Sequence, residues 1–101
     1  MAETQKTAER RVFTIIANIP KGKVASYGQI AQLARMPSHA RLVGRILSRL
    51  PDTTSLPWHR VVNSQGHIIN PGAQRQRKKL EDEGVTLVNG RISLRLYGWE
   101  P

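Results

Sequence analysis

The sequence predicts a single, mainly α-helical domain over residues 1–101, with a small β component. Apolar residues recur at helical spacing in the first half of the chain. Near the C-terminus, an Asn-Gly pair separates two short alternating runs, which is typical of a β-hairpin. A length of 101 residues and a hydrophobic fraction of 39% fit one folded domain with a modest core.

The N-terminal part of the chain holds two expected helices. The first spans residues 4–19, where Val12, Ile15, Ile16 and Ile19 share one face. Residues 20–23 interrupt it. Ser26 then predicts a capping box, in which its hydroxyl accepts a bond from a first-turn amide while the side chain of Gln29 reaches back. A second helix is therefore expected up to about Ala34.

A tight turn at residues 35–37 leads to a third expected helix, which Ser38 is predicted to cap and which reaches about Leu50. Its apolar stripe consists of Leu42, Val43, Ile46, Leu47 and Leu50, whereas Arg41, Arg45 and Arg49 line the opposing face. Two short helices joined by a tight turn, the second with an arginine face, predict a helix-turn-helix unit.

The C-terminal half is expected to be less regular. Residues 50–57 form a loop, residues 58–62 a compact segment, and residues 63–66 a turn. A polar helix over residues 74–83 should end at Gly84. A hairpin should turn at Asn89-Gly90. On it, Val85, Leu87, Ile92 and Leu94 face one side, and Thr86, Arg91 and Ser93 the other.

Charge points to a polyanionic partner. The net charge is +9, and between Arg35 and Lys79 nine basic residues accompany a single acid, Asp52. Such a field attracts nucleic acid, with a merely solubilising surface as the alternative. For the cluster Arg75, Arg77, Lys78 and Lys79, DNA contact and a solvated helix face are equally compatible with charge alone.

Composition also excludes several classes of site. The chain has no cysteine, so a disulfide, a thiolate nucleophile and a cysteine-ligated metal are all impossible. The three histidines lack zinc-site spacing, so we expect neither a metal nor a cofactor. No segment has the length of a membrane span. The polar start of the chain lacks a signal-peptide pattern, so we expect a cytoplasmic, nucleoid-associated protein in a bacterium or a nuclear one in a eukaryote.

The segment Pro57-Trp58-His59-Arg60-Val61-Val62 resembles the Pro-Cys-His-Arg-Val motif of O6-alkylguanine-DNA alkyltransferases, with tryptophan in place of the cysteine. Other stretches resemble that family in the same order: residues 19–24, residues 26–31, residues 40–44 and Glu83-Gly84. The tryptophan variant is typical of the alkyltransferase-like proteins. The resemblance covers about residues 10 to 88 and implies a winged-helix-like helix-turn-helix domain of the alkyltransferase C-terminal type.

The resemblance implies that the chain binds O6-alkylguanine in double-stranded DNA by flipping the nucleotide, without accepting the alkyl group. The helix after the turn would lie in the minor groove, with Arg41 as an arginine finger that fills the space of the extruded base. DNA contacts would come from Tyr27, Ser38, His39, Ala40, Arg41, Arg45 and Arg49. The alkylguanine pocket would be lined by Tyr27, Trp58, Val61, Ile69, Asn70, Pro71 and Gly72.

Local physical chemistry agrees on two of these residues. Arg41 lies in the first turn of its helix, where the helix dipole disfavours a cation, so local stability does not explain it. Trp58 offers apolar surface but no nucleophilic atom, so it predicts a pocket wall, with an ordinary buried tryptophan as the alternative. His59 and Glu83, which match the family's base and its orienting carboxylate, are expected to persist as a hydrogen-bond pair. Arg60 is expected to brace the fold.

The favoured interpretation is a monomeric, non-enzymatic DNA damage sensor that signals to nucleotide excision repair proteins. One alternative is a helix-turn-helix transcription regulator that reads undamaged DNA, which would leave the Pro-Trp-His-Arg motif unexplained. A second is an enzyme in which His59 and Glu83 activate water for dealkylation. Water is a much poorer nucleophile than thiolate at an alkyl carbon, which disfavours this second alternative.

Overall fold

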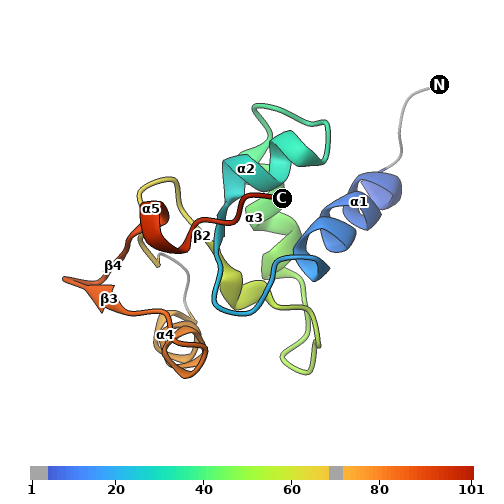
Figure 1. Ribbon diagram of the computed structural model, residues 1–101. Coiled ribbons are helices and arrows are strands. Elements are labelled where there is room, and N and C mark those ends of the chain that lie inside the picture. Colours follow the sequence, from blue (N-terminus) through green and yellow to red (C-terminus); the bar gives the residue numbers. More distant parts are fainter. Residues whose placement is uncertain (1–4, 69–71) are drawn as a thin grey trace.

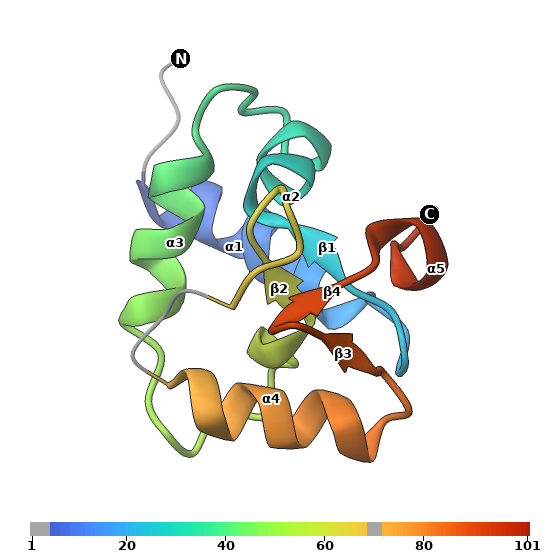
Figure 2. The ribbon, with the colours of Figure 1, turned by 90° about the vertical axis from the view of Figure 1, so that its left-hand side faces the viewer.

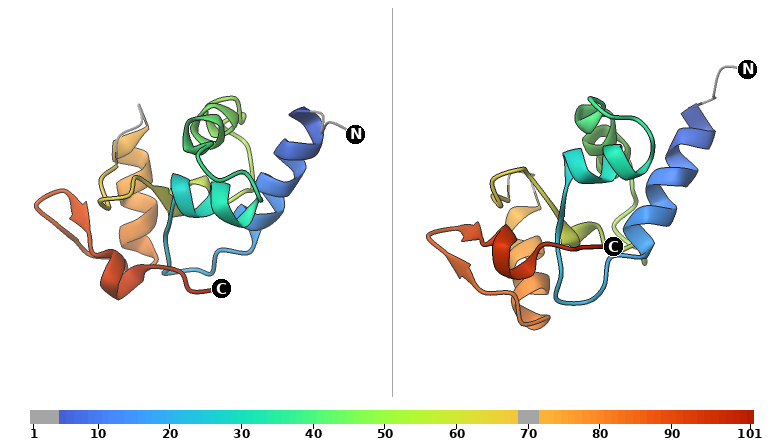
Figure 3. Two further views of the ribbon diagram at one scale, coloured as in Figure 1. Left: turned by 90° about the horizontal axis from the view of Figure 1, so that it is seen from above. Right: turned by 45° about the horizontal axis from the view of Figure 1, so that its top comes forward.

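The computed structural model describes residues 5–68 and 72–101 and confirms a mainly helical fold with a small β component (Figure 1). In chain order the elements are α1 (Gln5–Ala17), β1 (Ala25–Ser26), α2 (Tyr27–Leu33), α3 (Ala40–Ser48), the 3₁₀ turn η1 (Trp58–Arg60), β2 (Val61–Val62), α4 (Ala73–Asp82), β3 (Leu87–Val88), β4 (Arg91–Ile92) and α5 (Leu94–Tyr97). Helices α1 to α3 lie at one end of the molecule, and α4 with the β3–β4 hairpin lies at the other (Figure 3).

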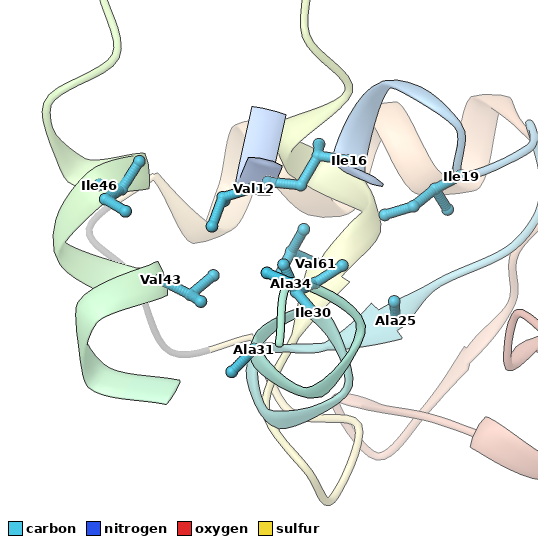
Figure 4. Close-up of a cluster of buried hydrophobic side chains, with 10 residues drawn as sticks. All are labelled: Val12, Ile16, Ile19, Ala25, Ile30, Ala31, Ala34, Val43, Ile46 and Val61. Carbon is cyan, nitrogen blue, oxygen red and sulfur yellow. The ribbon is translucent and has the colours of Figure 1, made fainter. Parts of the chain in front are cut away.

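The three N-terminal helices enclose the larger of two cores. Val12 and Ile16 on α1, Ile30 on α2 with Ala34 at its C-cap, and Val43 and Ile46 on α3 point toward one another (Figure 4). Each of these side chains is at most 2% exposed. The helical spacing in the sequence therefore identified the buried faces of α1 and α3. Burying a branched aliphatic side chain contributes about 1.5–3 kcal/mol, so this contact holds the helix-turn-helix against α1.

The turn between α2 and α3 is built by backbone bonds. Arg35 adopts a left-handed conformation (φ 61°), and the amides of Arg35 and Met36 donate to the carbonyls of Gln32 and Ala31, at 3.1 and 2.8 Å. These two bonds form a Schellman motif, which satisfies the last carbonyl groups of α2.

The prediction that Ser38 caps α3 is wrong. The N-cap of α3 is His39, which makes no capping bond with its side chain, and Ser38 itself has φ 74°. The Nδ1 atom of His39 instead lies 3.1 Å from the carbonyl oxygen of Pro37. Ser38 lies one residue before the N-cap and has left-handed backbone, so its hydroxyl does not cap the helix.

The predicted capping box at α2 is half correct. Ser26 is the N-cap of α2, and its hydroxyl accepts a bond from the amide of Gln29 at 3.0 Å. The side chain of Gln29 does not reach back, however. Its Nε2 donates to the carbonyl oxygen of Trp99 at 2.9 Å, so a tertiary contact with the C-terminal segment replaces the local one.

A short parallel ribbon separates the two cores. Strand β1 pairs with β2, with Ala25 opposite Val61 and Ser26 opposite Val62. Successive strand residues face opposite sides. Val61 therefore packs into the N-terminal core, whereas Val62 packs with Val24, Leu80, Val85 and Ile92 into the C-terminal core. This pairing, between segments far apart in the chain, was not predicted from the sequence.

Two local predictions at the C-terminal end are confirmed. Gly84, at φ 89°, follows the last turn of α4, and the Gly84 and Val85 amides donate to the carbonyls of Glu81 and Leu80 in a second Schellman motif. Strands β3 and β4 pair antiparallel across Asn89 and Gly90, both with positive φ as a type I′ turn requires. Helix α5, which follows the hairpin, was not predicted.

Gly66 shows how closely the hairpin approaches the preceding loop. Its φ is 82°, its carbonyl accepts a bond from the Ile92 amide at 2.9 Å, and a Cβ atom at this position would overlap the Ile92 carbonyl oxygen. Gly84 has a similar φ of 89°, but the space around its Cβ position is open.

We expect Gly66→Ala to lower the free energy of unfolding by about 3 kcal/mol, because it adds a steric clash to the cost of left-handed backbone. Gly84→Ala, the matched control, should cost only about 1 kcal/mol. Urea unfolding followed by circular dichroism measures both. Equal losses in the two variants would contradict the proposed close contact.

Candidate nucleic-acid interface and adjoining pocket

Helix α3 presents a row of cations to solvent. Arg41, Arg45 and Arg49 are all exposed, and Arg41 lies in the first turn of the helix as predicted. Within residues 5–68 and 72–101, no carboxylate forms an ion pair with these three guanidinium groups. Three unneutralised positive charges on one helix face form a surface suited to phosphate groups. The residues before this helix, Ser38 and His39, are also exposed, and Ala40 is half-buried.

A pocket of about 300 Å³ opens beside α3. Its lining residues come from α2, α3, the following loop, η1 and α4: Tyr27, Gly44, Leu47, Ser48, Leu50, Pro51, Asp52, Thr54, Trp58, Gly72 and Arg75. The structure thus brings together three of the residues predicted for a pocket, namely Tyr27, Trp58 and Gly72. Trp58 is half-buried, with part of its surface on the pocket, and is therefore not an ordinary core residue.

The assignment of Val61 to the pocket is wrong. Val61 is 1% exposed and belongs to the N-terminal core, because its pairing with Ala25 turns its side chain toward α1 and α2. The other predicted wall residues, Ile69, Asn70 and Pro71, lie outside the described residues. Sequence reasoning missed most of the wall formed by α3 and the loop after it, including Gly44, Leu47 and Thr54. Gly44, a glycine within α3, was the signal in the sequence that could have indicated this wall.

Arg75 makes several contacts at the edge of the pocket. Its guanidinium carbon lies 5.5 Å from the centre of the Trp58 ring, within cation–π range. Its Nη2 atom donates to the carbonyl oxygen of Asp52 at 2.9 Å, and Nη1 lies 3.6 Å from the Asp52 carboxylate. Both side chains are largely exposed, at 49% and 97%, so the ion pair itself adds little stability. Arg75 instead holds the loop after α3 next to the indole.

The remaining cations on α4 divide into different roles. Arg77 pairs with Glu81 at 3.1 Å and Lys78 with Asp82 at 3.9 Å, each one helical turn apart. These pairs neutralise one another on an exposed helix face. Of the basic cluster on α4, Arg75 is therefore the residue that the structure places at the pocket.

Behind Trp58 lies a largely buried ion-pair network centred on Glu83. The Glu83 carboxylate accepts bonds from His59 Nε2 at 2.9 Å, from Arg60 Nη2 at 2.6 Å and from Arg60 Nε at 3.0 Å. Arg60 Nη1 also donates to the carbonyl oxygen of Ile19 at 2.7 Å. The expected hydrogen bond between His59 and Glu83 and the bracing role of Arg60 are both confirmed.

The network sets the protonation of its members. Burial alone would raise the pKa of Glu83, but the bonds from Arg60 and His59 lower this pKa to about 2. Burial lowers the pKa of His59 below its ordinary value of 6.5, although the adjacent carboxylate opposes this effect. At neutral pH, His59 is therefore uncharged and donates its Nε2 proton to an ionised Glu83. Its Nδ1 atom is buried and has no hydrogen-bond partner among the described residues.

Gln76 connects α4 to the segment that follows Trp58. Its side chain is fully buried, and Nε2 donates to the carbonyl oxygens of His59 and Val61 at 3.0 and 2.8 Å. The backbone around Trp58 is thus held from one side by α4 and from the other by Arg60. A side chain anchored in this way presents a preorganised surface to the pocket.

Thiol chemistry is excluded at this site. The whole sequence lacks cysteine, so no thiolate can attack a bound group. In the part of the chain that the structure describes, no group of His, Asp and Glu residues has an arrangement suited to a metal ion. The helices in that part are also too short and too polar to cross a bilayer.

Fold and site together define a helix-turn-helix domain with a partly apolar pocket beside its arginine-bearing helix. The chain belongs to the family described as 6-O-methylguanine DNA methyltransferase, DNA binding domain, whose model matches residues 7–85. It is 49% identical over 94 residues to the DNA base-flipping protein of Vibrio parahaemolyticus, covering 90% of this chain and 94% of that one. It is 43% identical to alkyltransferase-like protein 1 of Schizosaccharomyces pombe, covering 90% and 93%.

A solved structure gives the same result at the level of the fold. The crystal structure of S. pombe Atl1 in complex with damaged DNA containing O6-carboxymethylguanine matches with a TM-score of 0.90 and 38% identity. The match covers 99% of this chain and all of that one, at 100%. These findings confirm the predicted fold class and the resemblance to alkyltransferase-like proteins.

We expect Glu83→Ala to lower the free energy of unfolding by about 3 kcal/mol, because it leaves Arg60 buried without a partner charge. The matched control is Glu81→Ala, which breaks an exposed pair on the same helix and should cost less than about 0.5 kcal/mol. Chemical denaturation measures both. Similar losses for the two variants would show that the buried network does not hold the fold.

The same network predicts acid sensitivity. The pKa of Glu83 is about 2 in the folded protein against an ordinary 4.5, so the unfolded chain binds the proton more readily. The stabilisation is complete above pH 4.5 and is lost as the pH falls from 4.5 toward 2. Melting temperatures recorded across this range should fall more steeply for the wild-type protein than for Glu83→Gln.

Proposed function

We propose that this protein is a non-enzymatic sensor that binds O6-alkylguanine in double-stranded DNA by rotating the nucleotide into the pocket beside α3. The observation that carries the proposal is the position of Trp58, which lines a pocket directly next to an exposed arginine helix. Two relatives support it. One is called a DNA base-flipping protein, and another was crystallised with DNA containing O6-carboxymethylguanine.

The pocket suits a planar, partly apolar guest. Its volume of about 300 Å³ lies at the lower end of the range of small-molecule sites. Trp58 and Tyr27 provide aromatic surfaces for a base and its alkyl group, and Leu47 and Leu50 add aliphatic ones. No atom of an indole can displace an alkyl group from oxygen, so the bound adduct would remain intact.

Helix α3 would dock in the minor groove, with Arg41 inserted where the base leaves the stack. A long, planar and permanently charged side chain can both stack on neighbouring bases and donate hydrogen bonds there. Arg45 and Arg49 would neutralise phosphates, while Tyr27 would donate to the phosphate beside the rotated nucleotide. Ser38, His39 and Ala40 precede Arg41 and would lie closest to the groove.

Energetics explain why the lesion would be selected. Flipping costs a few kcal/mol of lost stacking and pairing, and less at a pair already weakened by alkylation. Contacts in the pocket and the insertion of Arg41 must offset that cost. Because phosphate contacts release counterions, binding should weaken steeply as salt concentration rises.

A sensor without catalytic chemistry needs a downstream reaction. We infer that it acts as a monomer and passes the lesion to nucleotide excision repair proteins, which remove damage without acting on the alkyl group itself. Its location would be that of the DNA: cytoplasmic with the nucleoid in a bacterium, or nuclear in a eukaryote.

One experiment separates the possible functions. The protein is titrated against matched duplexes with and without a single O6-methylguanine, and the DNA is then recovered and its bases analysed. Preference for the lesion with the methyl group intact supports the sensor. Equal binding to both duplexes would indicate a general DNA binder or a transcription regulator, and a demethylated base would establish an enzyme.

We expect Arg41→Ala to remove most of the preference for the lesion, because nothing would fill the gap left by the rotated base. Arg45→Ala is the matched control one helical turn away. It should weaken binding to both duplexes equally and reduce the salt slope by about one. Fluorescence anisotropy at several salt concentrations measures both. A lesion preference unchanged in Arg41→Ala would refute the role.

We expect Trp58→Cys to transfer a methyl group at most weakly. His59 and Glu83 remain in place to activate a thiol. Leu50, however, occupies the position at which the alkyltransferases that the sequence resembles carry an asparagine, and this difference argues against efficient transfer. Transfer of radiolabelled methyl from DNA to protein, compared with Trp58→Ser, is the measurement. Efficient repair of several adducts by Trp58→Cys would show that the pocket is already complete for catalysis.

A further inference from the structure

A second groove lies at the opposite end of the molecule from the arginine helix. It has a volume of about 920 Å³ and lies among the loop 64–67, the β3–β4 hairpin and α5. Helix α3 and helix α5 occupy opposite sides of the molecule in Figure 2, so DNA bound along α3 would leave this groove open. Its size is comparable with that of sites that hold sizeable ligands, roughly 300–1,000 Å³.

The groove carries exposed apolar side chains that the fold does not need. In the described part of the chain the large apolar residues that are exposed are Leu33, Val88 and Leu96, and the last two line this groove, at 66% and 67% exposure. Leaving two such side chains in water on one small surface is unfavourable unless something covers them.

These side chains are carried by firmly held backbone. The Tyr97 hydroxyl accepts a bond from the Thr86 amide at 3.3 Å, which ties α5 to the residue before β3. The Val24 amide donates to the Tyr97 carbonyl at 2.9 Å, and the Arg91 side chain donates to the Gln65 carbonyl at 2.8 Å. The exposure of Val88 and Leu96 is therefore a property of a built surface, not of a loose chain end.

The charges around the groove have one sign. Arg91 and Arg95 line it, and among the described lining residues there is no Asp or Glu. A matching ligand would therefore carry negative charge and apolar groups together. DNA phosphates would satisfy the cations but would leave the aliphatic side chains uncovered, whereas a protein segment with carboxylates and apolar residues satisfies both.

We propose that this groove docks an acidic segment of a partner protein that also carries apolar side chains. The proposal does not depend on which DNA lesion the other end of the molecule binds. It provides a contact that a partner could make while α3 is occupied, because α3 and α5 lie on opposite sides of the molecule in Figure 2.

The test uses the full chain, labelled with ¹⁵N, and short synthetic peptides at physiological salt. One peptide is rich in glutamate and carries a few leucines. In two control peptides, serine replaces the leucines or lysine replaces the glutamates. We expect only the first to shift the amide resonances of Val88, Arg95 and Leu96. Equally tight binding of the glutamate-serine peptide would reduce the effect to general charge attraction and overturn the proposal.

Variants localise the contact. Leu96→Ser and Arg95→Glu should each weaken binding of the leucine-containing peptide by about tenfold. The matched controls, Leu33→Ser and Arg10→Glu, remove an exposed leucine and an exposed arginine elsewhere and should change little. Val88→Ser serves as a second groove variant should Leu96→Ser fail to fold. Equal losses in groove and control variants would overturn the proposal.

Two further measurements distinguish the groove from DNA recognition. An undamaged duplex should leave the groove resonances unshifted, and competition between duplex and peptide for them would identify a nucleic-acid surface instead. Binding of Leu96→Ser to the O6-methylguanine duplex should equal that of the wild type. Loss of peptide binding alone would then be assigned to the groove, and loss of lesion preference to the proposed function.

Discussion

The arrangement of the site depends on the ion pair and hydrogen bonds that the Glu83 carboxylate makes with Arg60 and His59. The carboxylate stands at the end of α4, yet it accepts bonds from His59 and Arg60 of η1, and Arg60 continues to the carbonyl of Ile19 after α1. One ionised group thereby joins the two ends of an elongated molecule of 45 × 28 × 20 Å. Removing a partner from such a buried network leaves an uncompensated charge, which is why its members depend on one another.

The network also explains how a half-buried tryptophan becomes a binding surface. Trp58 is followed directly by the two residues that Glu83 holds, and Gln76 binds the backbone carbonyls on either side of Arg60. The indole therefore cannot retreat into either core. The parallel pairing of β1 and β2 then directs the side chains of Val61 and Val62 into separate cores. Within the segment 58–62, Trp58 is the residue that lines the pocket.

Among the described residues, some cations are neutralised by acids, and others are left unpaired at the proposed binding surfaces. The acids of α4 neutralise Arg77 and Lys78 along the helix, and Arg75 lies against Trp58 and donates to the backbone carbonyl of Asp52. The arginines of α3 have no such partner in residues 5–68 and 72–101, and neither does the groove beside α5 contain an acid among its described lining residues. Positive charge is thus left available at two ends of the molecule, where the proposed partners are polyanionic or acidic.

The sequence by itself determined most of the features that depend on neighbours within about one helical turn. It predicted the buried faces of α1 and α3, the cap at Ser26, the stop at Gly84, the Asn89-Gly90 turn and the exposed row Arg41, Arg45 and Arg49, because these follow from spacing and backbone preference. It also indicated the family, through the ordered motifs around Trp58. Only the tertiary structure decided the partner of Gln29, the burial of Val61, the unused cap at Ser38, the β1–β2 ribbon and the stacking of Arg75. Each of these depends on contacts between segments brought together by packing, or on backbone geometry that the surrounding fold imposes, and neither leaves a periodic signal in the sequence.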